Sequence, residues 1–322
     1  MIDISAYQKV ARCIRRARRV ALCIHMFPDG DAIGSMVALA LCLKKMGKRV
    51  VLFSPSELPR RYRFLPLYAN IRQSASGAGV FDLAIALDCA SKVQLDDLYL
   101  CVFQKALTTI EIDHHSFRKK FAQVSLIDDK AAAVGEIIYK LARLLRVAIG
   151  QDIAIPLLVS LIVETGSFRL PSVTPATFRI CADLTSRGVN YYDIVEKSYW
   201  SRTRAEAMLL GLCFSRIKFS NGGRLAISHV TSKDLKRLKA QEEDVDPMID
   251  QIRTLKEVRV AMLFREMPGH LWRVSLRSKG SANVGRVAEA FGGGGHPDVA
   301  GCFIPKTSQA KQELIRRVSK IV

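Results

Sequence analysis

Short apolar runs rich in β-forming residues alternate with segments of helical periodicity through the first half of the chain. The strand-like runs are residues 19–24, 49–53, 82–87 and 108–112. The helical segments are 33–46, which is followed by Gly47, and 131–145. Strands that are apolar almost throughout and alternate with helices are typical of a parallel sheet covered on both faces. We therefore predict an α/β fold with a parallel, doubly wound sheet.

The length of 322 residues predicts two domains, because a single hydrophobic core rarely serves more than about 250–300 residues. From about residue 213 the pattern changes to the strand-like runs RLAISHV, VRVAMLF and WRVSLRS. The helical segments of this part are 232–240, 246–255 and 283–291. We predict a first domain over residues 1–187, a helical linker over 188–212 and a smaller α+β domain over 213–322.

Acidic and histidine side chains follow three of the predicted strands. They are His25, Asp29 and Asp31 after the first strand, Asp88 after the third, and Asp113, His114 and His115 after the next. Because the carboxyl ends of parallel strands open onto one crevice, we expect these seven side chains to converge. So many carboxylates and imidazoles would repel one another and lose solvation unless cations were bound. The mixed donor set suits Mn²⁺ or Mg²⁺, or another divalent ion.

Each motif has a simpler explanation when it is taken alone. Pro28, Asp29 and Gly30 are turn-forming residues, Asp88 is a suitable helix N-cap, and a pair of histidines is more often structural than ligating. Their shared position after successive strands favours a metal site. Two ions about 3.5–4 Å apart, bridged by one carboxylate, would activate a water molecule and clamp a phosphate for in-line displacement.

Three segments, in this order, resemble the first three motifs of the DHH phosphoesterase superfamily. They are HMFPDGDAIGS, ALDCA and IDHHS. This superfamily includes RecJ-like exonucleases, family II inorganic pyrophosphatases and bacterial nanoRNases. The C-terminal segment SLRSKGSANVGRVAEAFGGGGHPDVAG resembles the DHH-associated domain of the nanoRNase-type branch. Together the resemblance covers nearly the whole chain.

The resemblance implies a role for each matching residue. The metal ligands would be His25, Asp29 and Asp88 for one manganese ion, and Asp31, Asp88 and His114 for the second. Asp88 would therefore bridge the two ions. His115 matches a phosphate-contacting histidine, and Asp113 matches a carboxylate that orients the histidines. His115 and Asp113 are the expected catalytic residues.

The fourth motif departs from the family pattern D-T-G-x-F, which supplies another metal-binding aspartate. This chain has Glu164-Thr165-Gly166-Ser167-Phe168 in its place. Glutamate is one methylene longer, so its oxygen either coordinates with a displaced backbone or passes the ideal position. We expect Glu164 to remain a metal ligand. If Glu164 lay outside the coordination sphere, the second ion would bind weakly and activity would be reduced or altered.

A run of four glycines, Gly292–Gly295, follows the helix expected over Asn283–Phe291. One glycine is enough to end a helix, whereas several in succession let backbone N–H groups approach a phosphate closely. The alternative is a flexible loop packed against the next strand, 301–304. The alternative to substrate binding is that Arg277 is only an exposed strand residue and that Phe168 is only a core residue. The substrate-binding residues that we expect from the resemblance are Arg277, Ser278, Gly293, Gly294, Gly295, His296 and Phe168.

The chain is strongly basic, with 49 Lys and Arg against 30 Asp and Glu and a formal net charge of +19. This charge predicts a polyanionic partner, or else reflects a generally basic proteome. The eight cysteines form no CxxC pair, so we expect free thiols and a cytoplasmic location. The sequence contains no uninterrupted run of about eighteen apolar residues, so we do not expect a membrane span. A homodimer is the default expectation for the assembly.

We expect a divalent-metal-dependent phosphodiesterase that uses two Mn²⁺ ions. Its substrates would be short single-stranded RNA or DNA oligonucleotides and dinucleotides, cut to 5′-mononucleotides. The resemblance also implies dephosphorylation of 3′-phosphoadenosine 5′-phosphate. One alternative is a phosphodiesterase for cyclic di-AMP or the linear dinucleotide pApA. The other is a degenerate protein that binds nucleotides or RNA without cutting them, because Glu164 replaces the usual aspartate.

Overall fold

The computed structural model describes residues 4–322, which form two compact units. The first unit contains the chain up to His115 together with Lys119–Ser201. The second contains Ser116–Arg118 and Arg202–Val322. The division at residue 201 lies between helices α6 (Tyr191–Tyr199) and α7 (Arg204–Ser215), inside the segment predicted as the linker.

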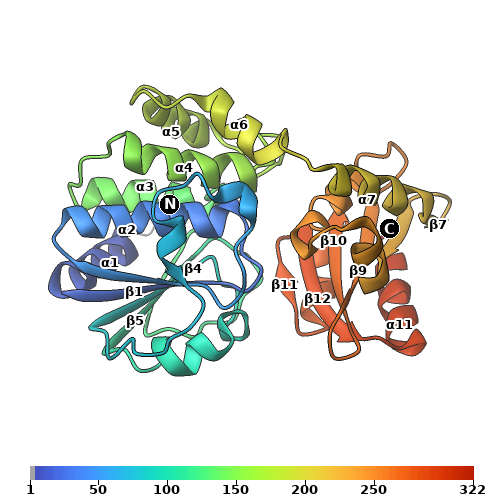
Figure 1. The fold of residues 1–322 in the computed structure, drawn as a ribbon, viewed down its shortest axis with the longest axis horizontal. Helices are drawn as coiled ribbons and strands as arrows, with labels where there is room; N and C mark the ends of the chain where they lie inside the picture. The colour runs from blue at the N-terminus through green and yellow to red at the C-terminus, as the bar shows by residue number, and fades with distance from the viewer. Residues whose placement is uncertain (1–3) are drawn as a thin grey trace. The chain divides into compact units, whose positions relative to one another are not determined.

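A six-stranded parallel sheet forms the centre of the first unit, as predicted (Figure 1). Its order is β3-β2-β1-β4-β5-β6, and every neighbouring pair is parallel. The strands are β1 (Arg19–Ile24), β2 (Arg49–Phe53), β3 (Ile71–Arg72), β4 (Leu83–Leu87), β5 (Thr108–Asp113) and β6 (Val124–Ile127). The four predicted strands are confirmed. The other two, β3 and β6, have two and four residues, which is too short for a periodic signal.

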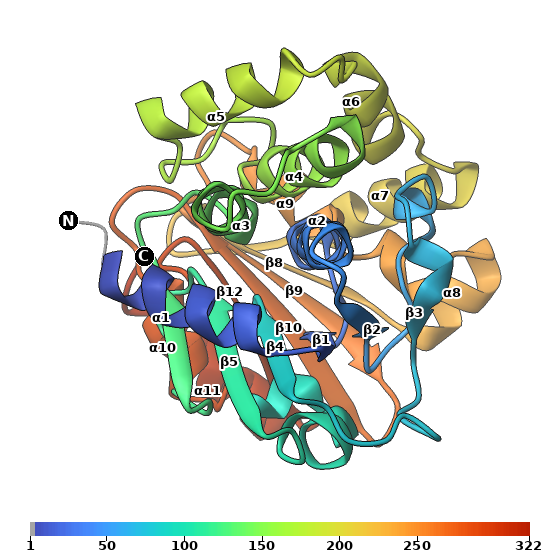
Figure 2. The same cartoon turned by 90° about the vertical axis from the view of Figure 1, so that its left-hand side faces the viewer.

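Both faces of this sheet are buried, which explains why its strands are apolar almost throughout. In β1, Val20, Leu22 and Ile24 contribute to a large core, whereas Ala21 and Cys23 contribute to a smaller one. Four helices contribute most of the large core: α1 (Ile4–Arg16), α2 (Gly30–Lys45), α3 (Val134–Leu144) and α4 (Gln151–Glu164). In Figure 2, α5 (Pro175–Thr185) and α6 form an outer layer over α4.

Helix α4 is apolar on nearly all sides because it lies between α2 and the outer helices. It approaches α2 so closely that a Cβ atom at Gly34 would lie 2.5 Å from the carbonyl oxygen of Pro156. Only glycine therefore permits this contact. With 14 residues, α4 is short, and within residues 4–322 no helix is long and apolar enough to cross a membrane.

Two helices begin a few residues away from their predicted starts, for local reasons. Helix α2 begins at Gly30 rather than at residue 33, because the Asp29 side chain already caps the backbone N–H groups of Asp31 and Ala32. Helix α3 begins at Val134 rather than at residue 131, because Ala133 has extended backbone with φ −162° and ψ 159°.

A mixed six-stranded sheet forms the second unit, which confirms the predicted α+β domain. Its order is β11-β12-β10-β9-β8-β7; β8 and β9 are parallel and the other pairs are antiparallel. The strands are β7 (Lys218–Ser220), β8 (Leu225–Val230), β9 (Val260–Met267), β10 (Leu271–Ser278), β11 (Gly294–Gly295) and β12 (Val299–Pro305). The helices are α8 (Ser232–Leu238), α9 (Met248–Arg253), α10 (Val284–Glu289) and α11 (Ser308–Ser319). The sequence did not predict α11, whose buried residues are few.

Candidate metal centre and substrate-binding residues

The turn after β1 places two carboxylates at the start of α2. Oδ1 of Asp29 accepts hydrogen bonds from the backbone N–H groups of Asp31 (2.9 Å) and Ala32 (3.0 Å). Asp31 is fully buried, and its oxygens accept hydrogen bonds from the N–H groups of Val134 (2.8 Å) and Gly135 (3.2 Å). The turn expected from Pro28, Asp29 and Gly30 is thus present and orients the Asp29 carboxylate, whereas the start of α3 orients that of Asp31.

Asp88 follows β4 in a left-handed backbone conformation, with φ +59°. It is buried, and its Oδ2 lies 3.6 Å from Nε2 of His25. Its Oδ1 lies 3.7 Å from Nε2 of His114 and 3.5 Å from Nδ1 of His115. The helix that follows has Ser91 as its N-cap, so Asp88 does not act as a cap. Non-glycine residues with this backbone are uncommon and concentrate at functional sites.

Asp113, at the end of β5, orients the two histidines that follow it. Its Oδ1 accepts hydrogen bonds from the backbone N–H of His114 (2.8 Å) and from Nδ1 of His115 (2.7 Å). Asp113 and His114 are buried, and His115 is partly exposed. The expectation that Asp113 orients the histidines therefore agrees with its contacts.

Two imidazoles, those of His25 and His114, present Nε2 toward carboxylates. Nδ1 of His25 donates to the carbonyl oxygen of Met26 (2.8 Å), and Nδ1 of His114 donates to that of Ala131 (3.2 Å). A neutral imidazole that donates from Nδ1 has a free lone pair on Nε2, which is the form that binds metals.

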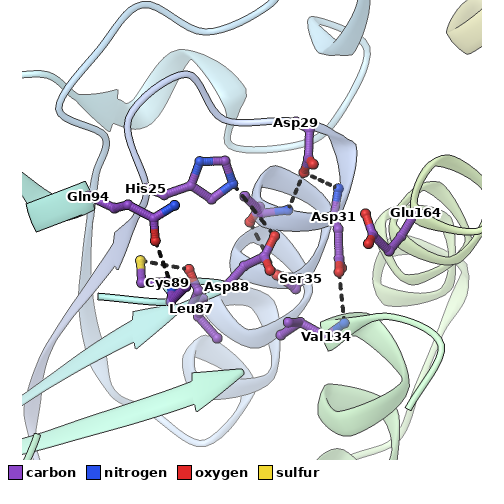
Figure 3. A network of polar contacts seen from close by, with 12 residues as sticks. His25, Asp29, Asp31, Ser35, Leu87, Asp88, Cys89, Gln94, Val134 and Glu164 are labelled. Carbon is purple, nitrogen blue, oxygen red and sulfur yellow. Dashed lines mark hydrogen bonds and ion pairs between the residues drawn. The ribbon is translucent and has the colours of Figure 1, made fainter. Parts of the chain in front are cut away.

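Glu164, the last residue of α4, reaches the same cluster. Its Oε1 lies 3.5 Å from Nε2 of His114, and Oδ2 of Asp31 lies 3.5 Å from the same nitrogen. Figure 3 shows the Glu164 carboxylate directed toward Asp31. The additional methylene therefore does not carry this carboxylate out of the cluster.

Two of the compact groups of donor atoms together contain the residues that the resemblance assigns to the two ions, and each is small enough for one ion. The groups are His25, Asp29 and Asp88, and Asp31, His114 and Glu164. Within each group one ligand atom per residue lies within 4.8 Å of the others. Two ligands at about 2.0–2.2 Å from one ion lie roughly 3–4 Å apart, which matches the separations around Asp88 and His114. Imidazole nitrogens and carboxylate oxygens of this kind fit two divalent cations.

Burial and neighbouring charges shift the pKa values of these groups. Burial raises the pKa of Asp31 well above its usual value, and the carboxylates of Asp88 and Asp29 add to this shift. Burial alone would raise the pKa of Asp88, but the surrounding imidazoles outweigh it and lower this pKa. Burial lowers the pKa of His115, but the carboxylate of Asp113 outweighs it and raises this pKa to about 10. Cations would relieve the repulsion among these buried carboxylates.

Ser160, which holds Asp31 in place, was not predicted from the sequence. Ser160 is fully buried on α4; its hydroxyl donates to Oδ1 of Asp31 (2.5 Å) and accepts a hydrogen bond from the N–H of Gly135 (2.9 Å). The available signal was a single serine inside the apolar run IAIPLLVSLIV. A polar residue fully buried among apolar ones needs a partner, and here the partner is a candidate metal ligand.

Phe168 lies four residues after Glu164, in a turn where Ser167 and Phe168 both have positive φ angles, +60° and +64°. Its half-buried ring lies 5.4 Å from the ring of Phe178 and 6.3 Å from that of Tyr191. Phe168 thus packs against protein aromatic rings, as the simpler interpretation expected. Stacking of Phe168 on a nucleotide base stays a prediction.

Arg277 and Ser278, at the end of β10, have partners within the second unit. Nε of Arg277 donates to Oδ1 of Asp250 on α9 (3.0 Å). Ser278 is buried, and its hydroxyl donates to the carbonyl oxygen of Ala282 (2.6 Å), which stabilises the turn before α10. Phosphate binding by Arg277 stays a prediction and would require the ion pair with Asp250 to be shared or broken.

The glycine run packs tightly against β12. Gly292 has φ +75° and ends the helical turn after α10, as expected. A Cβ atom at Gly293 would lie 2.1 Å from a β12 carbonyl oxygen, and one at Gly295 would lie 2.3 Å from another. Gly294 and Gly295 pair with β12, and the next N–H, that of His296, bonds to the same strand. The alternative of packing against the next strand is therefore observed, and phosphate binding by these residues stays a prediction.

Comparison with known proteins agrees with this architecture. Residues 19–162 match the model of the DHH family, N-terminal domain, and residues 222–322 match that of the DHHA1 domain. The first match contains the three strand ends that carry the histidines and aspartates, and the second contains Arg277 and the glycine run. The two sets of motifs thus lie in the two matched domains.

Similar proteins match over most of the chain. A protein of Thermus thermophilus named bifunctional oligoribonuclease and PAP phosphatase NrnA is 29% identical over 285 residues, which are 88% of this chain and 84% of that protein. A probable protein of the same name from Streptococcus mutans is 25% identical, covering 92% and 93%. The crystal structure of an exopolyphosphatase-related protein from Bacteroides fragilis superposes with a TM-score of 0.86 at 22% identity, covering 99% and 97%. The chain is therefore a DHH-family protein, with the family's N-terminal domain followed by a DHHA1 domain.

Proposed function

We propose that this chain is a divalent-metal-dependent phosphodiesterase that releases 5′-mononucleotides from short oligonucleotides and dinucleotides. The observation that carries the proposal is the adjacency of the two donor groups, with Asp88 facing His25 of one and His114 of the other. Two adjacent divalent ions are the usual arrangement for in-line displacement at a phosphate. The relatives named oligoribonuclease support the substrate class.

The proposed metal ligands are His25, Asp29, Asp88, Asp31, His114 and Glu164. Two bound divalent ions, Mn²⁺ in the first place, would supply Lewis acidity toward the phosphate and lower the pKa of a coordinated water molecule. The protein's own contribution is orientation. Asp113 is a positioning residue that acts through His114 and His115, and backbone N–H groups fix Asp29 and Asp31.

We assign phosphate contact in the first unit to His115. Oδ1 of Asp113 accepts a hydrogen bond from Nδ1 of this ring at 2.7 Å, and its charge raises the pKa of His115, which favours the cationic form of the ring. A cationic imidazole beside a phosphate stabilises the negative charge that develops on its oxygens. In the second unit we assign nucleotide binding to Arg277, to Gly293–Gly295 and to His296, on the strength of the DHHA1 match.

A second candidate activity is hydrolysis of 3′-phosphoadenosine 5′-phosphate. The relatives whose names combine oligoribonuclease with PAP phosphatase favour it. One metal centre can serve both reactions, because a phosphomonoester and a phosphodiester present the same kind of phosphorus to an attacking water molecule. A protein that binds without cutting is disfavoured, since Glu164 lies within 3.5 Å of His114 despite replacing aspartate.

The test is a substrate panel incubated with Mn²⁺, with Mg²⁺ and with a chelator. The panel contains dinucleotides, oligonucleotides up to 24 residues, pApA, cyclic di-AMP and 3′-phosphoadenosine 5′-phosphate. We expect Mn²⁺-dependent release of 5′-mononucleotides from dinucleotides, lost in the chelator. Fastest hydrolysis of cyclic di-AMP would favour the signalling alternative. Binding of dinucleotides without turnover under any metal would overturn the proposal.

We also propose that the enzyme is cytoplasmic and homodimeric. All eight cysteines are free, which fits a reducing compartment. Dimers are the commonest closed assemblies of soluble proteins. Light scattering coupled to size-exclusion chromatography is expected to give twice the chain mass of 35.8 kDa. A mass equal to one chain would contradict the dimer, and fractionation of the source cells tests the location.

A further inference from the structure

Basic side chains gather where strands β1 and β2 begin, at the opposite strand ends from the donor groups. Helix α1 ends at Arg16 and β1 begins at Arg19; helix α2 ends at Lys45 and β2 begins at Arg49. Arg19 and Arg49 are register partners in the parallel pair, so the two helix ends and the two strand starts lie together. Helix α1 faces the viewer in Figure 2.

Three of the cations in this region stabilise the fold. Nζ of Lys48 donates to the carbonyl oxygen of Arg15 in the last turn of α1 (2.7 Å). Nη2 of Arg15 donates to the carbonyl oxygen of Leu144 at the end of α3 (3.2 Å). Lys45 pairs with Asp152 (3.1 Å). Cations at helix C-termini bond the last carbonyl groups and offset the negative end of the helix dipole.

Four further arginines, Arg12, Arg16, Arg18 and Arg49, have no such role; we call them the basic edge. All four side chains are exposed, and across residues 4–322 none of their guanidinium groups forms an ion pair or a hydrogen bond. The nearby carboxylate of Asp82 accepts backbone N–H groups, including that of Arg18 (2.8 Å), rather than a guanidinium. Helix α1 contains no acidic residue. The Asp82 carboxylate offsets part of the charge of Arg18, and no ion pair involves the guanidinium groups of Arg12, Arg16 and Arg49 among residues 4–322, so most of the positive charge of the basic edge is available to a partner.

We propose that the basic edge binds the phosphate backbone of single-stranded RNA longer than the proposed substrates. Exposed guanidinium groups pair with successive phosphates whatever the base sequence. A membrane surface is disfavoured, because the apolar residues of α1 that would insert into it, among them Tyr7, Val10 and Ile14, are buried in the core. The inference goes beyond the proposed hydrolysis, since the basic edge lies at the other strand ends.

The experiment measures binding of a fluorescein-labelled 24-nucleotide RNA by anisotropy at several salt concentrations, in EDTA, with the RNA checked for integrity afterwards. Three full-length proteins are compared. They are the wild type, the variant Arg12→Glu/Arg16→Glu/Arg49→Glu and the control Lys233→Glu/Lys236→Glu/Lys239→Glu. The control changes three exposed lysines on and beside α8 and alters the net charge by the same amount.

We expect the basic-edge variant to bind the RNA at least about tenfold more weakly, with the slope of log K against log salt reduced by about 2. The control should stay within twofold of the wild type, and both variants should hydrolyse dinucleotides like the wild type. Equal losses in both variants would overturn the proposal, as would unchanged binding by the basic-edge variant. If the basic-edge variant lost binding to anionic vesicles but still bound the RNA like the wild type, the proposal would be overturned in favour of a membrane-binding surface. Circular dichroism checks folding, and the milder Arg→Gln series replaces any variant that fails to fold.

Discussion

The two ends of the parallel sheet carry opposite charges and hold them differently. At the carboxyl ends, Asp31, Asp88 and His114 are buried, and hydrogen bonds or ion pairs fix each of them. At the amino ends, the guanidinium groups of the basic edge are exposed and form no hydrogen bond or ion pair among the described residues. Coordination chemistry depends on atomic positions, whereas polyanion binding depends on the number of charges. Changes of a single atom should therefore alter metal binding at the carboxyl ends, whereas changes of charge should alter polyanion binding at the amino ends.

Removal of the central carboxylate is expected to have the largest effect. Asp88→Asn removes the charge but keeps a side chain that tolerates the left-handed backbone at φ +59°. We expect turnover to fall by at least about 10³-fold with the fold retained. Mn²⁺ should raise the melting temperature of the wild type and not that of the variant. Wild-type turnover in a folded variant would contradict the two-ion arrangement.

Changes at Glu164 test whether its carboxylate binds metal. We expect Glu164→Asp to preserve or raise turnover, since it restores the family residue, and Glu164→Gln to lower turnover about 100-fold. Mn²⁺ titration by calorimetry should show one weakened site in the Gln variant. Equal activity of the wild type and the Gln variant would place this carboxylate outside the metal site.

The Ser160 hydroxyl tests whether this residue positions a metal ligand or only fills space in the core. Ser160→Ala removes the hydrogen bond to Asp31, and we expect Mn²⁺ affinity to fall by about 10–100-fold. Ser35→Ala is the matched control, because that serine is equally buried but its hydroxyl bonds only to the carbonyl oxygen of Ala32 in its own helix (3.2 Å). Similar affinities in the two variants would show that Ser160 serves packing alone.

The smallest expected effects distinguish two kinds of cation at the amino ends of the strands. Lys48→Ala removes a donor to the last turn of α1 and should lower the free energy of unfolding by about 0.5–1 kcal/mol. Arg49→Ala, which removes an exposed group, should change it by less than about 0.5 kcal/mol. Urea denaturation of both variants provides the measurement. A larger loss with Arg49→Ala would mean that the basic edge stabilises the fold.

The convergence of the metal-site residues was predictable because it follows from topology. Once β1, β4 and β5 are parallel neighbours, the residues after them meet at one edge, so His25, Asp88 and His114 need no long-range information. The strands themselves were predictable because both of their faces are buried. β3 and α11 were not, because one is two residues long and the other buries little.

The remaining features depend on packing between elements that are distant in sequence. Ser160 reaches Asp31 across 129 residues because α4 lies beside α2, and Glu164 at the end of α4 reaches His114. Such contacts are set by helix spacing, which no local pattern in the sequence encodes.

The glycine contact between α2 and α4 bears on how activity can be lost in evolution. Gly34 lies one turn from Asp31, and the backbone of Pro156 leaves no room for a methyl group beside it. A Gly34→Ala lineage would keep every proposed metal ligand while the two helices, with Asp31 and Ser160 on them, moved apart. Inactive members of this family could therefore keep all the metal ligands, and inspection of the ligands alone would count them as enzymes.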